Sequence, residues 1–238
     1  MSTVTEDEFD ALLSQIRLYR QLKGKTVLSF GDSIMHGAGN HSIPISHLMA
    51  EKYGMSAYDY SVNGATMGIY SGKSHIPDQV RKTAEYHHQP DLILINGGTN
   101  DMFRDVELGD IQSGFDMSKK TEDTYSGGFE KALWLIRSMW QDVPVIFIRV
   151  HNTNLSSDSN ERIFGERGLE VADKWHCGSA DIYNDTSMNG EDQEMADRYT
   201  YPNPDHNYKH DSIHPNALGY ATFYIPMIEQ VMAMAVND

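Results

Sequence analysis

The sequence contains little cysteine and few basic residues. Among its 238 residues there is one cysteine, Cys177, so the chain can form neither an internal disulfide nor a cysteine-rich metal site. Lys and Arg number 19 against 34 Asp and Glu, and the formal net charge is -15. An acidic surface repels nucleic-acid backbones and anionic lipid headgroups, so we expect neither nucleic acid nor a membrane as a partner.

Long apolar runs are also missing. No stretch of 18 apolar residues occurs, and the acidic amino terminus lacks the basic start and apolar core of a secretory signal. We therefore predict a cytoplasmic protein. The length suits a single domain over 1–238, in which residues 1–25 form an N-terminal helical extension that packs on the domain or on a second subunit. The sequence leaves open whether the chain forms a homo-oligomer.

Short apolar segments alternate with amphipathic ones along the chain. Strands alternating with helices are typical of a parallel sheet covered on both faces. The predicted strands are 26–30, 56–62, 91–95, 143–148 and 179–183. Predicted helices cover 5–23, a stretch ending at Gly54, 76–88, a long stretch around 129–140, 160–175, and a last helix that opens at Pro215 and bends at Pro226.

Residues 184–210 interrupt this alternation. The segment is polar, and we expect an irregular insert near the functional site. It contains two prolines, Pro202 and Pro204, and three tyrosines, Tyr199, Tyr201 and Tyr208.

Three residues from two distant parts of the chain have the chemistry of a serine hydrolase. Ser33 follows the first predicted strand, at the sheet edge where open parallel sheets bind ligands. His214 can serve as the base that takes the serine proton, and Asp211, three residues earlier, can orient the imidazole. We predict Ser33, His214 and Asp211 as catalytic residues.

Ester hydrolysis also needs hydrogen-bond donors for the oxyanion. Candidates follow the next two strands: Gly64 lies after the second, and Asn100 lies in Gly-Gly-Thr-Asn-Asp after the third. With the backbone N–H of Ser33, the N–H of Gly64 and the carboxamide of Asn100 make a predicted oxyanion hole.

These residues fall into four short blocks in a fixed order. Gly31-Asp32-Ser33, Gly64, Gly98-Thr99-Asn100-Asp101 and Asp211-x-x-His214 resemble the blocks of the SGNH hydrolases, or GDSL-type esterases and lipases. The resemblance runs from Thr26 to the final helix. Ile34 stands where the first block often has leucine, and Gly-x-Ser-x-Gly, the nucleophile elbow of other α/β-hydrolases, is absent.

The resemblance implies a flavodoxin-like three-layer α/β/α sandwich with a five-stranded parallel sheet. It also implies hydrolysis of an ester through an acyl-enzyme on Ser33, with no metal or cofactor. Because the insert is polar and rich in tyrosine, we favour short acyl esters, such as acetyl esters, of a carbohydrate or another polar alcohol. A lipase or thioesterase, or an inactive binding module of the same fold, remains an alternative.

Residues beside the motif blocks are the candidates for substrate binding. For His151, a loop histidine with satisfied ring nitrogens is an equal alternative. The candidates are Met35, His36, Met67, Met102, Phe103, His151 and Ile213.

A metal site is the rival interpretation near the carboxyl end. His206, His210 and His214 are spaced four apart beside Asp205 and Asp211, but this pattern needs a helix. The neighbouring prolines disfavour one, so we expect no metal.

Overall fold

A computed structural model describes residues 5–202 and 210–235 of the chain. Five strands form one parallel sheet in the order β2-β1-β3-β4-β5. The expected α/β/α sandwich with a five-stranded parallel sheet is therefore confirmed. The strands are β1 (Thr26–Phe30), β2 (Ser56–Asp59), β3 (Leu92–Ile95), β4 (Val145–Arg149) and β5 (Gly178–Asp181).

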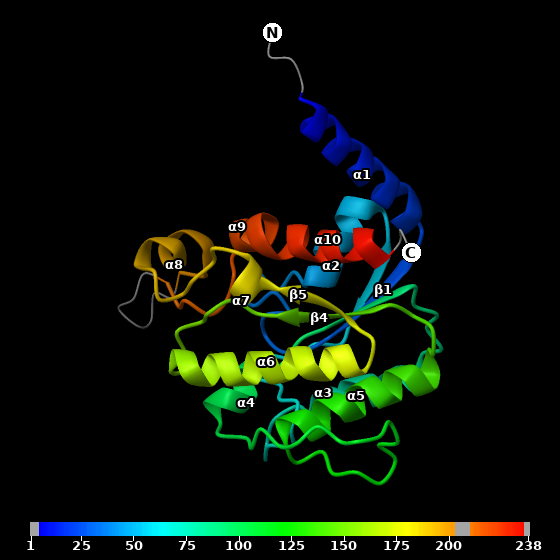
Figure 1. Ribbon diagram of the computed structural model, residues 1–238, viewed down its shortest axis with the longest axis vertical. Helices are drawn as coiled ribbons and strands as arrows, with labels where there is room; N and C mark the ends of the chain where they lie inside the picture. Colours follow the sequence, from blue (N-terminus) through cyan, green and yellow to red (C-terminus); the bar gives the residue numbers. More distant parts are fainter. Residues whose placement is uncertain (1–4, 203–209, 236–238) are drawn as a thin grey trace.

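Helices cover both faces of the sheet, as Figure 1 shows. One layer holds α1 (Glu6–Leu22), α2 (Ile45–Tyr53) and α10 (Ile225–Ala235); the other holds α3 (Ile76–Lys82), α5 (Tyr125–Met139) and α6 (Asp158–Lys174). Shorter pieces are α4 (Thr99–Phe103), α7 (Ile182–Asp185), α8 (Gln193–Tyr199), α9 (Ala217–Gly219), a 3₁₀ turn (Thr83–Glu85) and a π turn (Tyr220–Tyr224).

Strand side chains alternate between two buried cores because successive residues point to opposite faces. In β3, Leu92 and Leu94 enter the core beneath α2 and α10, whereas Ile93 and Ile95 enter the core beneath α3, α5 and α6. Both faces are apolar, which explains why the third strand reads as a continuous apolar run rather than an alternating one.

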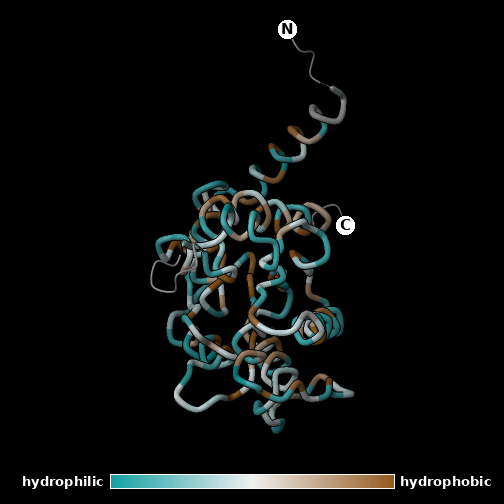
Figure 2. The backbone as a smooth tube through the Cα atoms, turned by 90° about the vertical axis from the view of Figure 1, so that its left-hand side faces the viewer, coloured by the Kyte–Doolittle hydropathy of each residue, from teal (hydrophilic) through white to brown (hydrophobic). Residues whose placement is uncertain are grey.

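The helix α1 extends away from the body of the molecule (Figure 2). Its last turns pack on the core through Leu18 and Leu22, while Leu12 and Ile16 are exposed. Among the described residues, no helix is long and apolar enough to cross a membrane.

Several expected boundaries are wrong. The second strand ends at Asp59, and α7 begins at Ile182 inside the predicted fifth strand. The insert is helical over α8 because Asp192 caps that helix, accepting from the N–H groups of Glu194 and Met195. Part of the insert, including Pro204, Asp205, His206 and Tyr208, lies outside the described residues.

The last helix begins later than expected. Asn216 caps it by accepting from Gly219 N–H at 3.0 Å, so Pro215 remains outside the helix and pairs with Thr200 instead. The π turn precedes Pro226, whose missing N–H cannot complete the regular helical ladder.

Candidate active site

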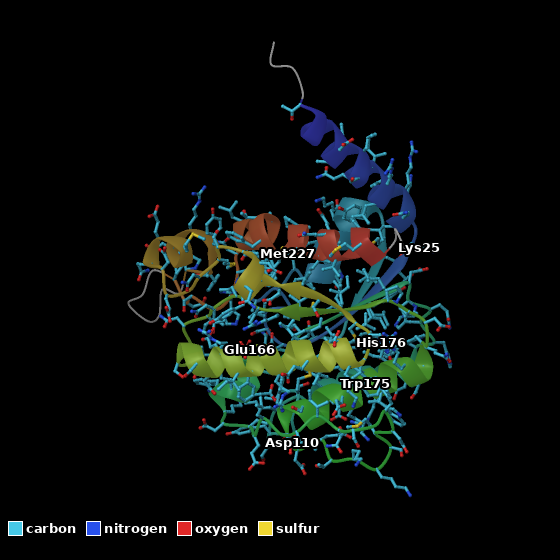
Figure 3. The ribbon with its side chains drawn as sticks, in the orientation of Figure 1. Lys25, Asp110, Glu166, Trp175, His176 and Met227 are labelled. Carbon is cyan, nitrogen blue, oxygen red and sulfur yellow. The ribbon has the colours of Figure 1, made fainter. Side chains whose placement is uncertain are left out.

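The carboxyl ends of the strands share one edge of the sheet. Figure 3 labels Lys25 and His176 on its right-hand side, just before β1 and β5 begin, so the strands end toward the left, where α4, α7 and α8 lie in Figure 1. From β1 the chain adds β2 on one side of the sheet and then β3, β4 and β5 on the other. Open sheets bind ligands at such a switch point, which here lies between β1 and β3. Ser33 and Asn100 follow these two strands.

Ser33, His214 and Asp211 form a hydrogen-bonded line across this edge. The Oγ of Ser33 lies 2.8 Å from Nε2 of His214, although 181 positions separate them in the chain. On the other side of the ring, Nδ1 lies 2.5 Å from Oδ2 of Asp211. A carboxylate accepts only, so Nδ1 carries the proton and Nε2 is left to accept from the serine hydroxyl.

Asp211 also shapes the turn that carries the imidazole. Its Oδ1 accepts from the backbone N–H of Ile213 at 3.1 Å and of His214 at 2.9 Å. Burial works to raise the pKa of Asp211, but the hydrogen bond and charge of His214 outweigh it, so the pKa is lowered. The carboxylate therefore stays ionised at neutral pH.

His151 supports the turn that carries His214 by contacting its backbone. It is 1% exposed, its Nε2 donates to the backbone oxygen of Ser212 at 3.0 Å, and its Nδ1 accepts from the hydroxyl of Tyr224 at 2.7 Å. Burial lowers the pKa of His151 to about 4, so the ring is neutral. Both nitrogens are satisfied, as expected for a loop histidine, and the residue also lines a pocket with Gly98 and Thr99.

Buried polar side chains hold the turn that presents Ser33. Asp32 is fully buried, and its Oδ1 accepts from Ile34 N–H and from Asn96 Nδ2, each at 2.9 Å. Gln79 holds both the N–H and the oxygen of Gly31. A Cβ at Gly31 would lie 1.8 Å from Oδ1 of Asn96, so only glycine fits.

The loops after β2 and β3 lie against this turn. Val62 N–H donates to the oxygen of Gly31 at 3.0 Å, which keeps the loop of Gly64 beside the serine turn. Asp101 holds the same loop by accepting from Met67 N–H at 2.9 Å and Gly68 N–H at 2.8 Å.

The backbone N–H groups of Ser33 and Gly64 are available as donors. Within 5–202 and 210–235, no residue accepts a hydrogen bond from either of them. The structure thus presents the two donors free on loops that contact each other.

Comparison with known proteins gives the family. A sequence model of the GDSL-like Lipase/Acylhydrolase family matches residues 29–222. The chain belongs to this family. The matched range contains the predicted nucleophile, base, orienting acid and oxyanion donors. A search of curated proteins found no match.

Solved structures share the fold. A protein from Lactobacillus plantarum is 20% identical with a TM-score of 0.67, and the match covers 91% of this chain and 98% of that one. A GDSL-like lipase from Bacteroides ovatus is 16% identical with a TM-score of 0.56, covering 90% and 99%. The psychrotrophic esterase EstA from Pseudoalteromonas sp. is 15% identical with a TM-score of 0.56, covering 90% and 100%.

The predicted substrate residues of this GDSL-like protein do not share one surface. Met102 is 6% exposed and lines a pocket with Gly98 and Thr99, whereas Met35 and Met67 are fully buried in opposite cores and serve packing in this structure. Their flanking position misled the sequence argument because core residues also neighbour the motif blocks. Phe103, in contrast, is 58% exposed.

The remaining candidates have local partners. His36 is partly exposed, and its Nδ1 lies 3.2 Å from Oδ2 of Asp59. Ile213 packs against the core beneath α10. In the insert, Tyr199 is buried against Phe223 and cannot stack on a ligand.

The metal interpretation rested on three histidines. His214 faces Ser33 and Asp211, and His210 Nε2 lies 3.4 Å from Asp197, while His206 and Asp205 are outside the described residues. In the part of the chain that the structure describes, no group of three His, Cys, Asp or Glu side chains could hold a metal ion.

Sequence reasoning missed the supporting residues Asn96 and Gln79. Both are buried, and neither has a motif of its own. The only signal was that Asn96 directly precedes the Gly-Gly of the third block.

Asp101 makes the stability of the fold pH-dependent. Burial raises its pKa from 3.8 to about 7, although the two backbone N–H groups oppose the shift. The folded state then holds a proton that the unfolded state has lost, so stability falls as pH rises through this window and levels off above it. We expect this carboxyl to lower the free energy of unfolding by about 2–3 kcal/mol between pH 5 and pH 8.

Urea denaturation of Asp101→Asn beside the wild type checks this expectation. The amide cannot ionise, so the variant's own destabilisation is a constant offset, and the difference between the two free energies must change with pH. Parallel curves from pH 5 to pH 8 would contradict the shift.

Proposed function

We propose that the protein is a serine esterase that hydrolyses short-chain acyl esters through an acyl-enzyme on Ser33. The observation that carries the proposal is the hydrogen-bonded line from Ser33 through His214 to Asp211. It supplies a nucleophile, a base within hydrogen-bond reach, and an acid that sets the ring's tautomer. Membership of the lipase and acylhydrolase family supports it.

The reaction proceeds in two steps. His214 Nε2 takes the proton from Ser33 as Oγ attacks the ester carbonyl carbon, and the oxyanion accepts from the N–H groups of Ser33 and Gly64 and from Nδ2 of Asn100. The intermediate collapses, and the alcohol leaves with the proton from His214. Water then attacks the acyl-enzyme by the same route, with His214 as base, and releases the acid and Ser33.

We further propose that the alcohol is a carbohydrate or another neutral polar group. The chain is strongly acidic, and Tyr201 presents a 41% exposed ring from a residue bonded to the catalytic turn. Its N–H donates to the oxygen of His214 at 2.8 Å, and its oxygen accepts from Asp211 N–H at 3.0 Å. A ring in this place can stack on a sugar face.

An esterase or lipase for longer acyl chains is the second candidate. Ile69, Tyr70 and Phe103 are exposed by 53%, 40% and 58%, and the rings of Tyr70 and Phe103 flank Arg104 beside Asn100. Exposed apolar side chains at the edge of the site suit a long acyl chain.

A panel of esters separates the two candidates. We expect kcat/KM for p-nitrophenyl acetate to exceed that for the octanoate by about tenfold or more, and acetylated xylo-oligosaccharides to release acetate. The opposite order of acyl lengths would favour the lipase. Hydrolysis of none of the esters would favour a binding module.

A further inference from the structure

Arg104 follows α4 and contacts the side chain of Asn100. Its Nη1 donates to Oδ1 of Asn100 at 2.8 Å and to the backbone oxygen of the same residue at 3.4 Å. A guanidinium has five donors and no acceptor, so only the oxygen of a carboxamide can face it. The Nδ2 group of Asn100 is therefore directed away from Arg104 and is free to donate elsewhere.

The same guanidinium reaches the second loop of the site. A Cβ at Gly64 would lie 3.6 Å from Nη2 of Arg104, which is van der Waals contact. One side chain thus lies against both Gly64 and Asn100, the residues that we propose to bind the oxyanion beside Ser33.

Aromatic rings hold Arg104 in place. The guanidinium carbon lies 5.8 Å from the centroid of the Tyr70 ring and 5.6 Å from that of Phe103, within the range of cation–π attraction. Of the acidic side chains that the structure describes, none forms an ion pair with Arg104. In the described residues its guanidinium thus contacts rings and amide oxygens rather than a carboxylate, in a chain of net charge -15.

We propose that Arg104 is a positioning residue of the oxyanion hole. It holds the Asn100 carboxamide with the oxygen outward and Nδ2 toward the substrate oxygen, and its charge polarises the amide so that Nδ2–H is a stronger donor. The proposal rests on the proposed function, because the role of Asn100 belongs to it. Without this contact the carboxamide could rotate about its Cβ–Cγ bond until its oxygen and nitrogen exchange places. In that orientation its oxygen would repel the oxyanion.

Kinetics of Arg104→Met and Arg104→Lys test the proposal. Methionine removes the donors, so we expect kcat on p-nitrophenyl acetate to fall about 10- to 100-fold with KM changed less than about threefold. Lysine is also a donor without an acceptor, so Arg104→Lys should retain most of the rate. A rise in KM alone, or an unchanged kcat, in Arg104→Met would overturn the proposal.

A double-mutant cycle distinguishes positioning from a general structural role. Asn100→Ala should lower kcat about 100- to 1000-fold. Adding Arg104→Met to it should lower kcat by less than about twofold more, because Arg104 acts through the missing amide. If the losses in kcat of the two single variants multiplied in the double variant, the proposal would be overturned. Arg137→Met is the matched control: Arg137 Nη1 donates to the oxygen of Val143 at 2.7 Å, before β4 begins, and its loss should leave kcat unchanged.

NMR of the Asn100 side chain tests the proposal without any catalytic reaction. The side-chain amide of Asn100, assigned by its loss in Asn100→Ala, should give one pair of resonances in the wild type and in Arg104→Lys. In Arg104→Met it should give doubled or averaged signals, because the carboxamide can then rotate between two orientations. A single unshifted pair in Arg104→Met would overturn the positioning role. If the wild type hydrolysed no ester while the amide behaved as expected, the proposed function would fail and the orientation by Arg104 would stand.

Discussion

Ser33→Ala should abolish ester hydrolysis and covalent labelling together. Alanine removes the hydroxyl on which we propose that the acyl-enzyme forms, while the turn keeps its buried support from Asp32, Asn96 and Gln79. We expect the rate on p-nitrophenyl acetate to fall by about 10⁴-fold or more. A fluorophosphonate probe should add one adduct to the wild type, located on Ser33 by mass spectrometry, and none to the variant.

Ser138→Ala is the control for this experiment. Ser138 is exposed on α5, and its Oγ donates only to Trp134 O in its own helix. The control should keep both the rate and the adduct. A Ser33→Ala protein that is folded by circular dichroism yet retains its rate would rule out Ser33 as the nucleophile. A wild type that takes up no probe would favour a binding module.

Asp211→Asn should cost about 10⁴-fold in kcat without unfolding the turn. The N–H groups of Ile213 and His214 require an oxygen at the position of Oδ1. The NH₂ group of the new amide must then face Nδ1 of His214. The ring would accept there and carry its proton on Nε2, so it could no longer take the proton of Ser33.

Asp192→Asn is the matched control for the tautomer argument. Asp192 also accepts from two backbone N–H groups, at the start of α8, but contacts no histidine ring among the described residues, and asparagine caps a helix equally well. Its kcat should match that of the wild type. If both variants kept the wild-type rate, Asp211 would not be the residue that orients His214.

Arg104 adds a positioning residue to the third motif block. The block supplies Asn100, and the residue four positions later determines which way its amide faces. Motif matching finds the donor atom but not the neighbour that orients it. In related chains without an arginine there, another donor-only group should occupy the same place.

The amino-acid sequence by itself determined the layer order of this protein and the family to which it belongs. Apolar runs such as the one at Leu92 and Ile93 must be covered on both faces, and alternating helices can cover them in only a few ways. Chain order and residue type were also enough to name Ser33, Asp211 and His214 as catalytic candidates, because few side chains can serve as nucleophile, acid or base, and the structure brings the three within hydrogen-bond distance.

Only the tertiary structure decided which neighbours of those residues face the site. Met35 and Met67 lie within two or three residues of a motif residue and are buried, whereas Phe103 is exposed. A turn points successive side chains in different directions, and burial depends on elements far away in the chain. For the same reason, the supports of the site, such as His151 beneath Ser212 and Asn96 beside Asp32, became visible only when distant loops were brought into contact.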